Sequence, residues 1–248
     1  AFSPNSELLK RMLTASSITV LKNQENILPV KGLDKKNIAV VSLGDTKGVT
    51  SMFQDRCEMY SKTGKYAYIK GAMLEILLNK LKPYNMIIVG VYNDDNDYVK
   101  ALNAITAQCD NVVPVFFTSP YSASKFKDGV EKSKATVIAW GADELAQDYA
   151  AQTIYGGNEA KGKSPITIEG VAAVGDGVKY EATRLGYTLP EEVGVSSDML
   201  KKIDRLANRC LRAGAFPGCQ VLIARKGKVI CNKAYGMHDY ETGTPVTV

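Results

Sequence analysis

The sequence predicts an α/β protein with a doubly wound, mostly parallel sheet that helices cover on both faces, a flavodoxin-like three-layer sandwich. Two observations predict this fold. Each expected strand is a short, continuous apolar run, which is typical of strands buried on both faces. Helices with one apolar side alternate with these runs at the spacing of strand–helix–strand units. With 248 residues, 45% of them hydrophobic, the chain can form a sizeable core and one or two domains.

Four apolar runs are expected to form the central strands. They are residues 37–43, 86–91, 112–117 and 135–140, with shorter extended pieces expected at 66–69 and 165–168. Pro114 lies inside the third run. Because proline has no backbone N–H, we expect a bulge or an edge-facing amide at that position.

Helices are expected between these strands, at residues 49–60, 72–81, 98–109, 124–130 and 144–155. The last is followed by Gly156 and Gly157, which are typical of a helix end. Ahead of the first strand, residues 6–21 have apolar positions at helical spacing and Ser6 as a plausible N-cap. We expect one amphipathic helix there, with an apolar face of Leu8, Leu9, Met12, Leu13, Ile18 and Leu21.

The last third of the chain is organised differently. We assign residues 1–170 to the α/β domain and residues 171–196, which are rich in glycine and lack a period, to a linker with one extended piece at 180–185. Residues 197–248 are expected to be an incomplete second domain. It would hold a helix over about 198–213, capped by Ser197, and a hairpin of residues 219–225 and 228–235 around Lys226-Gly227. With a two-residue turn, Cys219 and Cys231 face opposite sides, so no disulfide is expected between them.

Composition excludes several function classes. The net charge of +5 comes from 31 basic and 26 acidic residues, and the lysines are scattered, so we expect a solvated surface and no nucleic-acid partner. No apolar run approaches the ~18 residues of a membrane span, and no signal segment opens the chain. The five cysteines form no CxxC pair, and His238 is the single histidine. We therefore expect free thiols, no metal site and no cofactor.

Three stretches of the first 170 residues resemble the C-terminal α/β domain of glycoside hydrolase family 3. The run SITVLKN at 17–23 is followed by LPV at 28–30, and the third central strand ends in Ser119-Pro120-Tyr121. A helix with glutamine and several alanines then precedes the run GKSPITI at 162–168, in which Ser164 stands where the family usually has leucine.

This resemblance implies a role beside a catalytic domain. The family's nucleophilic aspartate lies in a separate barrel that precedes this domain, and no barrel sequence is present here. Some members take their acid/base glutamate from the loop after a central strand of this domain. The matching loop here, residues 90–97, contains aspartates and no glutamate, which agrees better with the N-acetylglucosaminidase branch, whose general acid is a barrel histidine.

The resemblance therefore implies that this chain contains no catalytic residue. It implies instead that the chain packs on the barrel of the same protein and helps to shape the carbohydrate site of that barrel. Asp94, Asp95 and Asp143 are candidate substrate contacts at the rim of that site. The alternative for all three is helix capping or a solvated loop. Asp45 and Ser119 also follow strands, where turn chemistry is the simpler interpretation.

The C-terminal residues resemble the start of the serine β-lactamase and penicillin-binding-protein family. The runs are FPGCQVLIARKGKVI at 216–230, AYGMHD at 234–239 and TGTPVT at 242–247. That family's Ser-x-x-Lys nucleophile motif comes later than these runs, so we expect nucleophile and base outside this chain. Ser122-Ala123-Ser124-Lys125 and Lys62-Thr63-Gly64 match family motifs by chance, since they lie in the other domain and in reversed order.

Together the two resemblances favour a fragment of a multidomain bacterial hydrolase that processes peptidoglycan outside the cytoplasm. Two alternatives remain open. One is a non-enzymatic, flavodoxin-like binding or scaffold domain with a hairpin appendage, and the other is part of a serine hydrolase or esterase. A nucleotide site is not expected, because the turn at residues 44–48 is too short for a phosphate-binding fingerprint.

Overall fold

The computed structural model describes residues 4–45 and 51–248. The chain divides into two compact units. We call residues 10–183 the α/β unit, and residues 184–248 together with the first nine residues the C-terminal unit.

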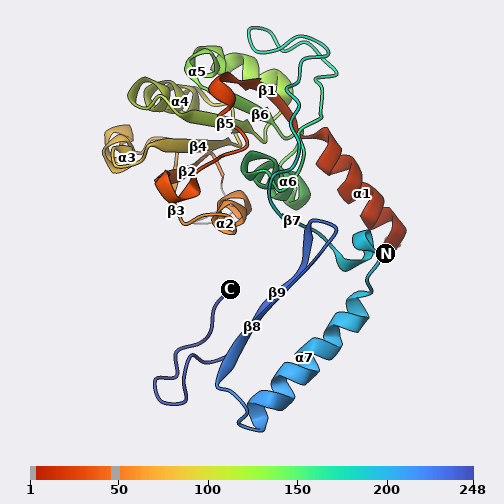
Figure 1. The fold of residues 1–248 in the computed structure, drawn as a ribbon. Helices are drawn as coiled ribbons and strands as arrows, with labels where there is room; N and C mark the ends of the chain where they lie inside the picture. The colour runs from red at the N-terminus through yellow and green to blue at the C-terminus, as the bar shows by residue number, and fades with distance from the viewer. Residues whose placement is uncertain (1–3, 46–50) are drawn as a thin grey trace. The chain divides into compact units, whose positions relative to one another are not determined.

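The α/β unit is built on a six-stranded sheet (Figure 1). Its strands are β1 (Thr19–Asn23), β2 (Ile38–Leu43), β3 (Thr63–Tyr68), β4 (Met86–Val91), β5 (Val112–Phe116) and β6 (Ala135–Ile138). They lie in the order β1-β6-β5-β4-β2-β3, and all neighbours are parallel except β1, which pairs antiparallel with β6. Without β1 this is the flavodoxin strand order, so the expected fold class is confirmed.

Helices cover both faces of the sheet, giving three layers (Figure 1). One face packs against α2 (Met52–Glu58) and α6 (Glu144–Tyr155), and the other against α3 (Leu74–Leu81), α4 (Asn96–Gln108) and α5 (Lys127–Lys132). Short 3₁₀ turns η1 (Gln24–Asn26), η2 (Leu33–Lys35) and η3 (Pro120–Phe126) lie in the connections.

The continuous apolar runs supply both cores because side chains alternate along a strand. In β2, Ile38 and Val40 contribute to the core under α2 and α6, whereas Ala39 and Val41 contribute to the core under α3 and α4. All four are fully buried. A strand buried in this way needs apolar residues at every position, which explains why the sequence locates β2 and β4 so closely.

The expectation of one helix over residues 6–21 is wrong. Helix α1 (Pro4–Ser17) ends before Ile18, and β1 follows directly. The three consecutive β-branched residues Ile18, Thr19 and Val20 favour a strand, and all three are fully buried. Pairing with β6 covers an edge of the sheet that would otherwise be open.

The bulge expected at Pro114 is absent, because the register of β4 and β5 runs without a shift from Ile87↔Val112 to Val91↔Phe116. Odd-numbered residues of β5 face β4 in the ladder, so the Pro114 nitrogen faces β6. The carbonyl that this nitrogen would otherwise face, that of Lys134 just before β6, accepts a hydrogen bond from the amide of Gln24 at 2.7 Å. The proline therefore lies in an interior strand without leaving this carbonyl unpaired.

Three predicted short extended segments also differ from the structure. Strand β3 begins at Thr63, earlier than expected, and residues 165–168 form no strand beyond a single bridge between Ile168 and Ala172. The extended piece expected at 180–185 is reduced to a bridge between Tyr180 and Ala160.

The C-terminal unit contains β7 (Gly186–Tyr187), η4 (Pro190–Val193), α7 (Ser197–Arg212), β8 (Gly218–Arg225) and β9 (Lys228–Gly236). Its sheet has the order β7-β9-β8. Lys226 and Gly227 have positive φ values of 52° and 74°, as a two-residue hairpin turn requires. On α7, Asp204 accepts hydrogen bonds from Lys233 (2.8 Å) and Tyr235 (2.5 Å), which tie the helix to β9.

The register predicted for this hairpin is wrong beyond its first residues. The register shifts between Ile223, which pairs with Cys231, and Ala224, which pairs with Val229, so Ile230 is an extra residue. Cys219, which pairs with Tyr235, therefore lies on the same face as Cys231. The two positions are four residues apart along the sheet, about 13 Å at the usual strand rise, and both thiols are free.

Candidate functional site

The sheet changes winding direction between β2 and β4, and ligands of open α/β sheets bind at the carboxyl ends of such strands. At that point the described residues are closely packed. Gly44, which follows β2, has φ +80°, and a Cβ built on it would lie 2.6 Å from the Asn93 Cβ and 3.0 Å from the Tyr98 ring. The amide of Tyr92 donates to the carbonyl of Leu43 at 2.9 Å. Residues 46–50, which follow Asp45 in the sequence, lie outside the described residues.

Asp94 and Asp95 lie together on the loop after β4, and each is paired with a lysine from another loop. Asp94 accepts a hydrogen bond from Lys125 of η3 at 2.7 Å. Asp95 accepts one from Lys70, which follows β3, also at 2.7 Å. Asp95 is in addition the N-cap of α4, because its side chain accepts the amide of Asp97 at 3.1 Å.

Asp143 lies on a separate loop, after β6. It is the N-cap of α6, accepting the Ala146 amide at 2.9 Å, and it forms an ion pair with Lys10 of α1 at 3.3 Å. Trp140 lies on the same loop, with a positive φ of 61°, and its indole N–H donates to Thr19 at 3.0 Å. The structure therefore brings Asp94 and Asp95 together and places Asp143 two strands away.

The surroundings of these aspartates keep them ionised. Hydrogen bonds from Lys125 and Ser122 lower the pKa of Asp94, and the Lys70 ammonium and the Asp97 amide lower the pKa of Asp95. Partial burial acts to raise the pKa of Asp143, but the Ala146 amide and Lys10 outweigh it, so the net shift is downward. A glycosidase general acid needs a raised pKa, so this geometry suits caps and ion pairs and not proton donation.

Gln147 is a buried residue of α6 that joins three elements, a role that the sequence does not predict. Its side-chain oxygen accepts the amide of Phe53 and the hydroxyl of Tyr92, both at 3.0 Å, and its nitrogen donates to the carbonyl of Ala142 at 2.9 Å. Burial also raises the pKa of the Tyr92 phenol well above its ordinary value. The signal in the sequence was a glutamine within an alanine-rich, otherwise apolar helix.

A second buried polar residue of α6, Asp148, was not predicted from the sequence either. Asp148 is 6% exposed and lies between Arg11 of α1 (3.8 Å) and Arg56 of α2 (3.7 Å). Gln152, one turn along α6, donates to the same carboxylate at 3.1 Å. Arg11 also lies over the Tyr149 ring, 5.4 Å from its centroid. These contacts fix α1 and α2 against α6, which positions the loops at the carboxyl edge of the sheet.

The remaining candidates have no catalytic arrangement. Both ends of the Ser-x-x-Lys match in η3 are engaged by Asp94, which accepts hydrogen bonds from Ser122 and from Lys125, so neither side chain is arranged for catalysis. His238 is exposed on a loop after β9. Among the described residues, no group of His, Cys, Asp and Glu side chains could hold a metal ion. In the same part of the chain, no helix is long and apolar enough to cross a bilayer.

Fold and site together define a doubly wound α/β domain whose carboxyl-edge aspartates are paired with lysines. No protein-family model and no curated protein matches the sequence. Solved structures do match. A fungal multidomain family 3 β-N-acetylglucosaminidase, described as having a GCN5-related glucosamine N-acetyltransferase region, aligns with 97% of this chain at a TM-score of 0.61 and 13% identity.

Two bacterial structures match the chain less completely. A family 3 β-N-acetylglucosaminidase from Paenibacillus sp. aligns with 71% of the chain at a TM-score of 0.52 and 13% identity. A β-glucosidase from Listeria innocua aligns with 64% at a TM-score of 0.52 and 12% identity. At such identities the likeness is one of fold, and the chain resembles a subdomain of family 3 glycoside hydrolases.

The chain spans only part of each protein that it matches, 31% of the fungal enzyme, 34% of the Paenibacillus enzyme and 26% of the Listeria enzyme. The comparisons give no support to the β-lactamase-like resemblance of the C-terminal residues.

Proposed function

We propose that this chain is the non-catalytic α/β domain of a multidomain glycoside hydrolase acting on β-linked N-acetylglucosamine or glucose. One observation carries the proposal: Asp94, Asp95 and Asp143, at the carboxyl edge of a family 3-like fold, are each ion-paired, with lowered pKa values. None is held as a proton donor, and the loop after β4 contains no glutamate. Catalysis would therefore reside in a barrel domain of the same protein.

In this proposal the domain contributes by holding its loops in place beside the barrel. The lysine pairs link the loops after β3, β4 and β5 to one another, and Gln147 anchors α6 to the start of α2. A rigid edge of this kind would pack on the barrel and shape the rim of a carbohydrate site, where Asp94, Asp95 and Asp143 would accept sugar hydroxyls as ionised carboxylates. The substrate preference, the barrel as partner and an extracytoplasmic location all belong to the proposal.

The C-terminal unit enters the proposal as the opening of a serine β-lactamase-like module. The runs at 216–230 and 234–239 carry this idea, and they form the hairpin of β8 and β9. The test is the gene sequence that follows residue 248. A Ser-x-x-Lys motif in the next helix supports the module, and a stop codon or unrelated sequence there contradicts it.

The glycosidase proposal is tested by release of nitrophenol from 4-nitrophenyl β-N-acetylglucosaminide and 4-nitrophenyl β-glucoside. The intact protein and the 248-residue chain are assayed side by side. We expect turnover of one substrate by the intact protein and none by the chain. Turnover by the chain would contradict the absence of catalytic groups in it, and silence of the intact protein on both substrates would favour a scaffold domain.

A further inference from the structure

Helix α7 carries a row of unpaired cations on its outer side. Lys202, Arg205, Arg209 and Arg212 follow one another at intervals of three and four residues, which places them on one side of a helix. At the usual helical rise they span about 15 Å. All four are exposed, and none has an ion-pair partner in the part of the chain that the structure describes. We call these four residues the α7 stripe.

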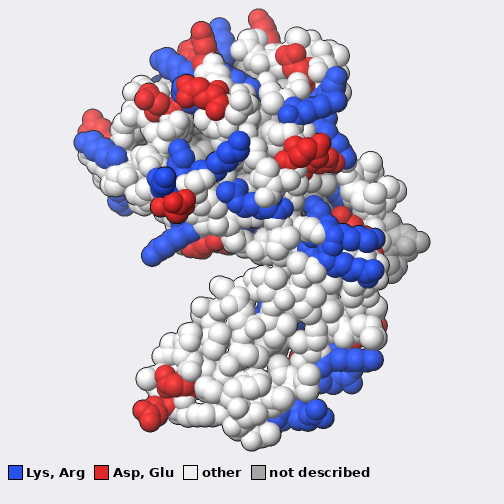
Figure 2. All heavy atoms as spheres, in the orientation of Figure 1, with Lys and Arg blue, Asp and Glu red and all other residues white. Residues whose placement is uncertain are grey.

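The acidic residues of α7 do not neutralise the stripe. Asp204 also lines the hollow beside the stripe, but its carboxylate is already engaged by Lys233 and Tyr235 of β9, and the Lys233 ammonium lowers its pKa. Asp198, in the first turn, is paired with Lys201 at 2.6 Å. The positive charge of the stripe is therefore open to a ligand, and Figure 2 shows basic side chains gathered over this helix.

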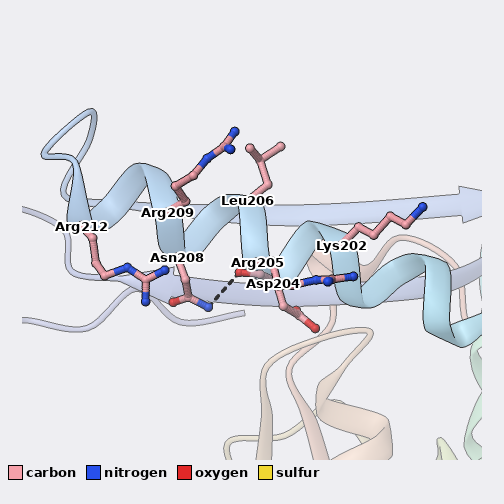
Figure 3. A pocket seen from close by; sticks show the side chains of 7 residues that line it. All are labelled: Lys202, Asp204, Arg205, Leu206, Asn208, Arg209 and Arg212. Carbon is pink, nitrogen blue, oxygen red and sulfur yellow. Dashed lines mark hydrogen bonds between the residues drawn. The ribbon is translucent and has the colours of Figure 1, made fainter.

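The stripe borders a hollow of about 750 Å³, which Asp204, Leu206 and Asn208 also line. In Figure 3 the side chains of Lys202, Leu206 and Arg209 extend from one side of the helix, and those of Arg205 and Arg212 lie on the adjoining side, with Asp204 and Asn208. Leu206 is 52% exposed, so an apolar surface lies within the row of cations. Asn208 is held to its own helix by a hydrogen bond to the Asp204 carbonyl at 2.8 Å.

We propose that the α7 stripe binds a linear acidic polysaccharide. Three of its four cations are arginines, whose planar guanidinium groups bind carboxylate or phosphate groups through two parallel hydrogen bonds. A straight row of charges matches anionic groups repeated along one extended chain, and Leu206 offers contact to the apolar face of a sugar ring. This binding is separate from the proposed glycosidase activity and does not depend on it.

Two other anionic partners fit less well. The residues lining the hollow include no aromatic side chain, and stacking on aromatic groups is what single-stranded nucleic acid requires. A helix that lies on a bilayer inserts its apolar face. The apolar side of α7 includes Ala207, which is 6% exposed, and α7 is held to β9 through Asp204, so this side is not open to a bilayer.

The test uses the full 248-residue chain and polygalacturonate as the probe, with binding measured by isothermal titration calorimetry. One variant carries Lys202→Gln, Arg205→Gln, Arg209→Gln and Arg212→Gln, which are exposed positions where glutamine preserves helix propensity. A matched control removes the same number of charges from exposed lysines of the α/β unit: Lys35→Gln, Lys80→Gln, Lys82→Gln and Lys100→Gln. Circular dichroism and thermal unfolding verify that both variants are folded.

We expect the stripe variant to lose at least about tenfold in affinity and the control to stay within about twofold. We also expect wild-type binding to weaken as salt rises from about 50 to 200 mM, since the contacts are ionic. Equal loss in both variants, or no loss in the stripe variant, would overturn the proposal. Stripe-dependent binding to single-stranded DNA or to phosphatidylserine vesicles, without binding to polygalacturonate, would overturn the choice of ligand.

Discussion

At the scale of single residues, position in the fold decides what a polar side chain does. Asp94, Asp95 and Gln147 all lie near the carboxyl edge of the sheet, where α/β proteins place functional groups. The sequence predicts that location for the aspartates, because it depends only on where strands end. It does not predict their lysine partners, since Lys70 and Lys125 come from distant loops. The part played by Gln147 was likewise visible only once α2, α6 and the loop after β4 were assembled.

Replacing Gln147 is expected to destabilise the α/β unit markedly. Gln147→Ala leaves the Phe53 amide and the Tyr92 hydroxyl without their acceptor in a buried site. We expect a loss of about 2–3 kcal/mol in the free energy of unfolding, because unsatisfied buried groups are costly. Urea denaturation of the purified chain measures it. Gln108→Ala, which removes one exposed hydrogen bond to Leu78, serves as control and is expected to cost about 0.5 kcal/mol.

Asp143 is expected to make stability depend on pH in the acid range. Its pKa is lowered in the folded chain, so it contributes stability above its unfolded pKa of about 3.9, and this contribution is lost as pH falls through the lower folded value. In the variant Asp143→Asn the side chain still caps α6 but cannot ionise. The stability difference between wild type and variant should therefore be present at pH 6 and shrink below about pH 4.

Urea denaturation between pH 2.5 and 7 measures this difference, with Asp110→Asn, at an exposed turn position, as the matched control. A difference between wild type and Asp143→Asn that is the same at every pH would contradict the role assigned to the Lys10 ion pair and the Ala146 hydrogen bond.

At the scale of elements, the strands of the central sheet were predicted far better than their neighbours. Strand β4 has the predicted bounds, 86–91, because burial on both faces requires an uninterrupted apolar run. Strand β1 was missed because its apolar residues continue the helical spacing of α1, and only pairing with β6 favours the strand. The hairpin turn at Lys226-Gly227 was predicted, but the bulge at Ile230 was not. The residues of the turn determine how the strands pair next to it, but they do not determine whether a bulge shifts the pairing a few residues further on.

The end of α6 requires glycine for two separate reasons. Gly156 has φ +82°, and a Cβ there would lie 2.4 Å from the Thr183 hydroxyl and 2.9 Å from the Pro29 Cβ. Gly32 has a similar φ of +61° but nothing within 4 Å of such a Cβ. Gly32→Ala should therefore cost only the backbone strain, about 1 kcal/mol. Gly156→Ala should cost roughly 2–4 kcal/mol, because the helix end must also move away from Pro29.

Thermal unfolding followed by circular dichroism compares the two variants. Equal shifts of the unfolding midpoint in the two variants would mean that Pro29 and Thr183 move aside at no cost. The close packing at the end of α6 would then contribute nothing to stability.

At the scale of the whole molecule, the two units differ greatly in how much core they possess. Both hydrophobic clusters belong to the α/β unit. In the C-terminal unit the described, buried apolar side chains are Pro190, Val193, Ala207, Val229, Ile230 and Cys231. We therefore expect a chain that ends at Thr183 to keep the main unfolding transition within about 3 °C of its midpoint in the full chain.

Residues 184–248 alone are expected to lack a cooperative transition, because so small a unit buries too little surface to fold alone. Differential scanning calorimetry of the two fragments decides both points. Loss of the main transition on removing residues 184–248 would contradict the independence of the α/β unit.

We propose that this domain shapes a carbohydrate site without supplying its chemistry. The most direct test is the steady-state kinetics of the intact protein carrying Asp94→Asn and Asp95→Asn together, and Asp143→Asn separately, on 4-nitrophenyl β-N-acetylglucosaminide. We expect kcat to stay within about threefold of wild type, with any effect confined to KM, because an acid or base catalyst would contribute ~10²–10⁴ in rate. A loss of kcat by a factor of about 100 or more in either variant, with the fold intact, would show that the replaced carboxylates take part in catalysis and would overturn the proposed non-catalytic role.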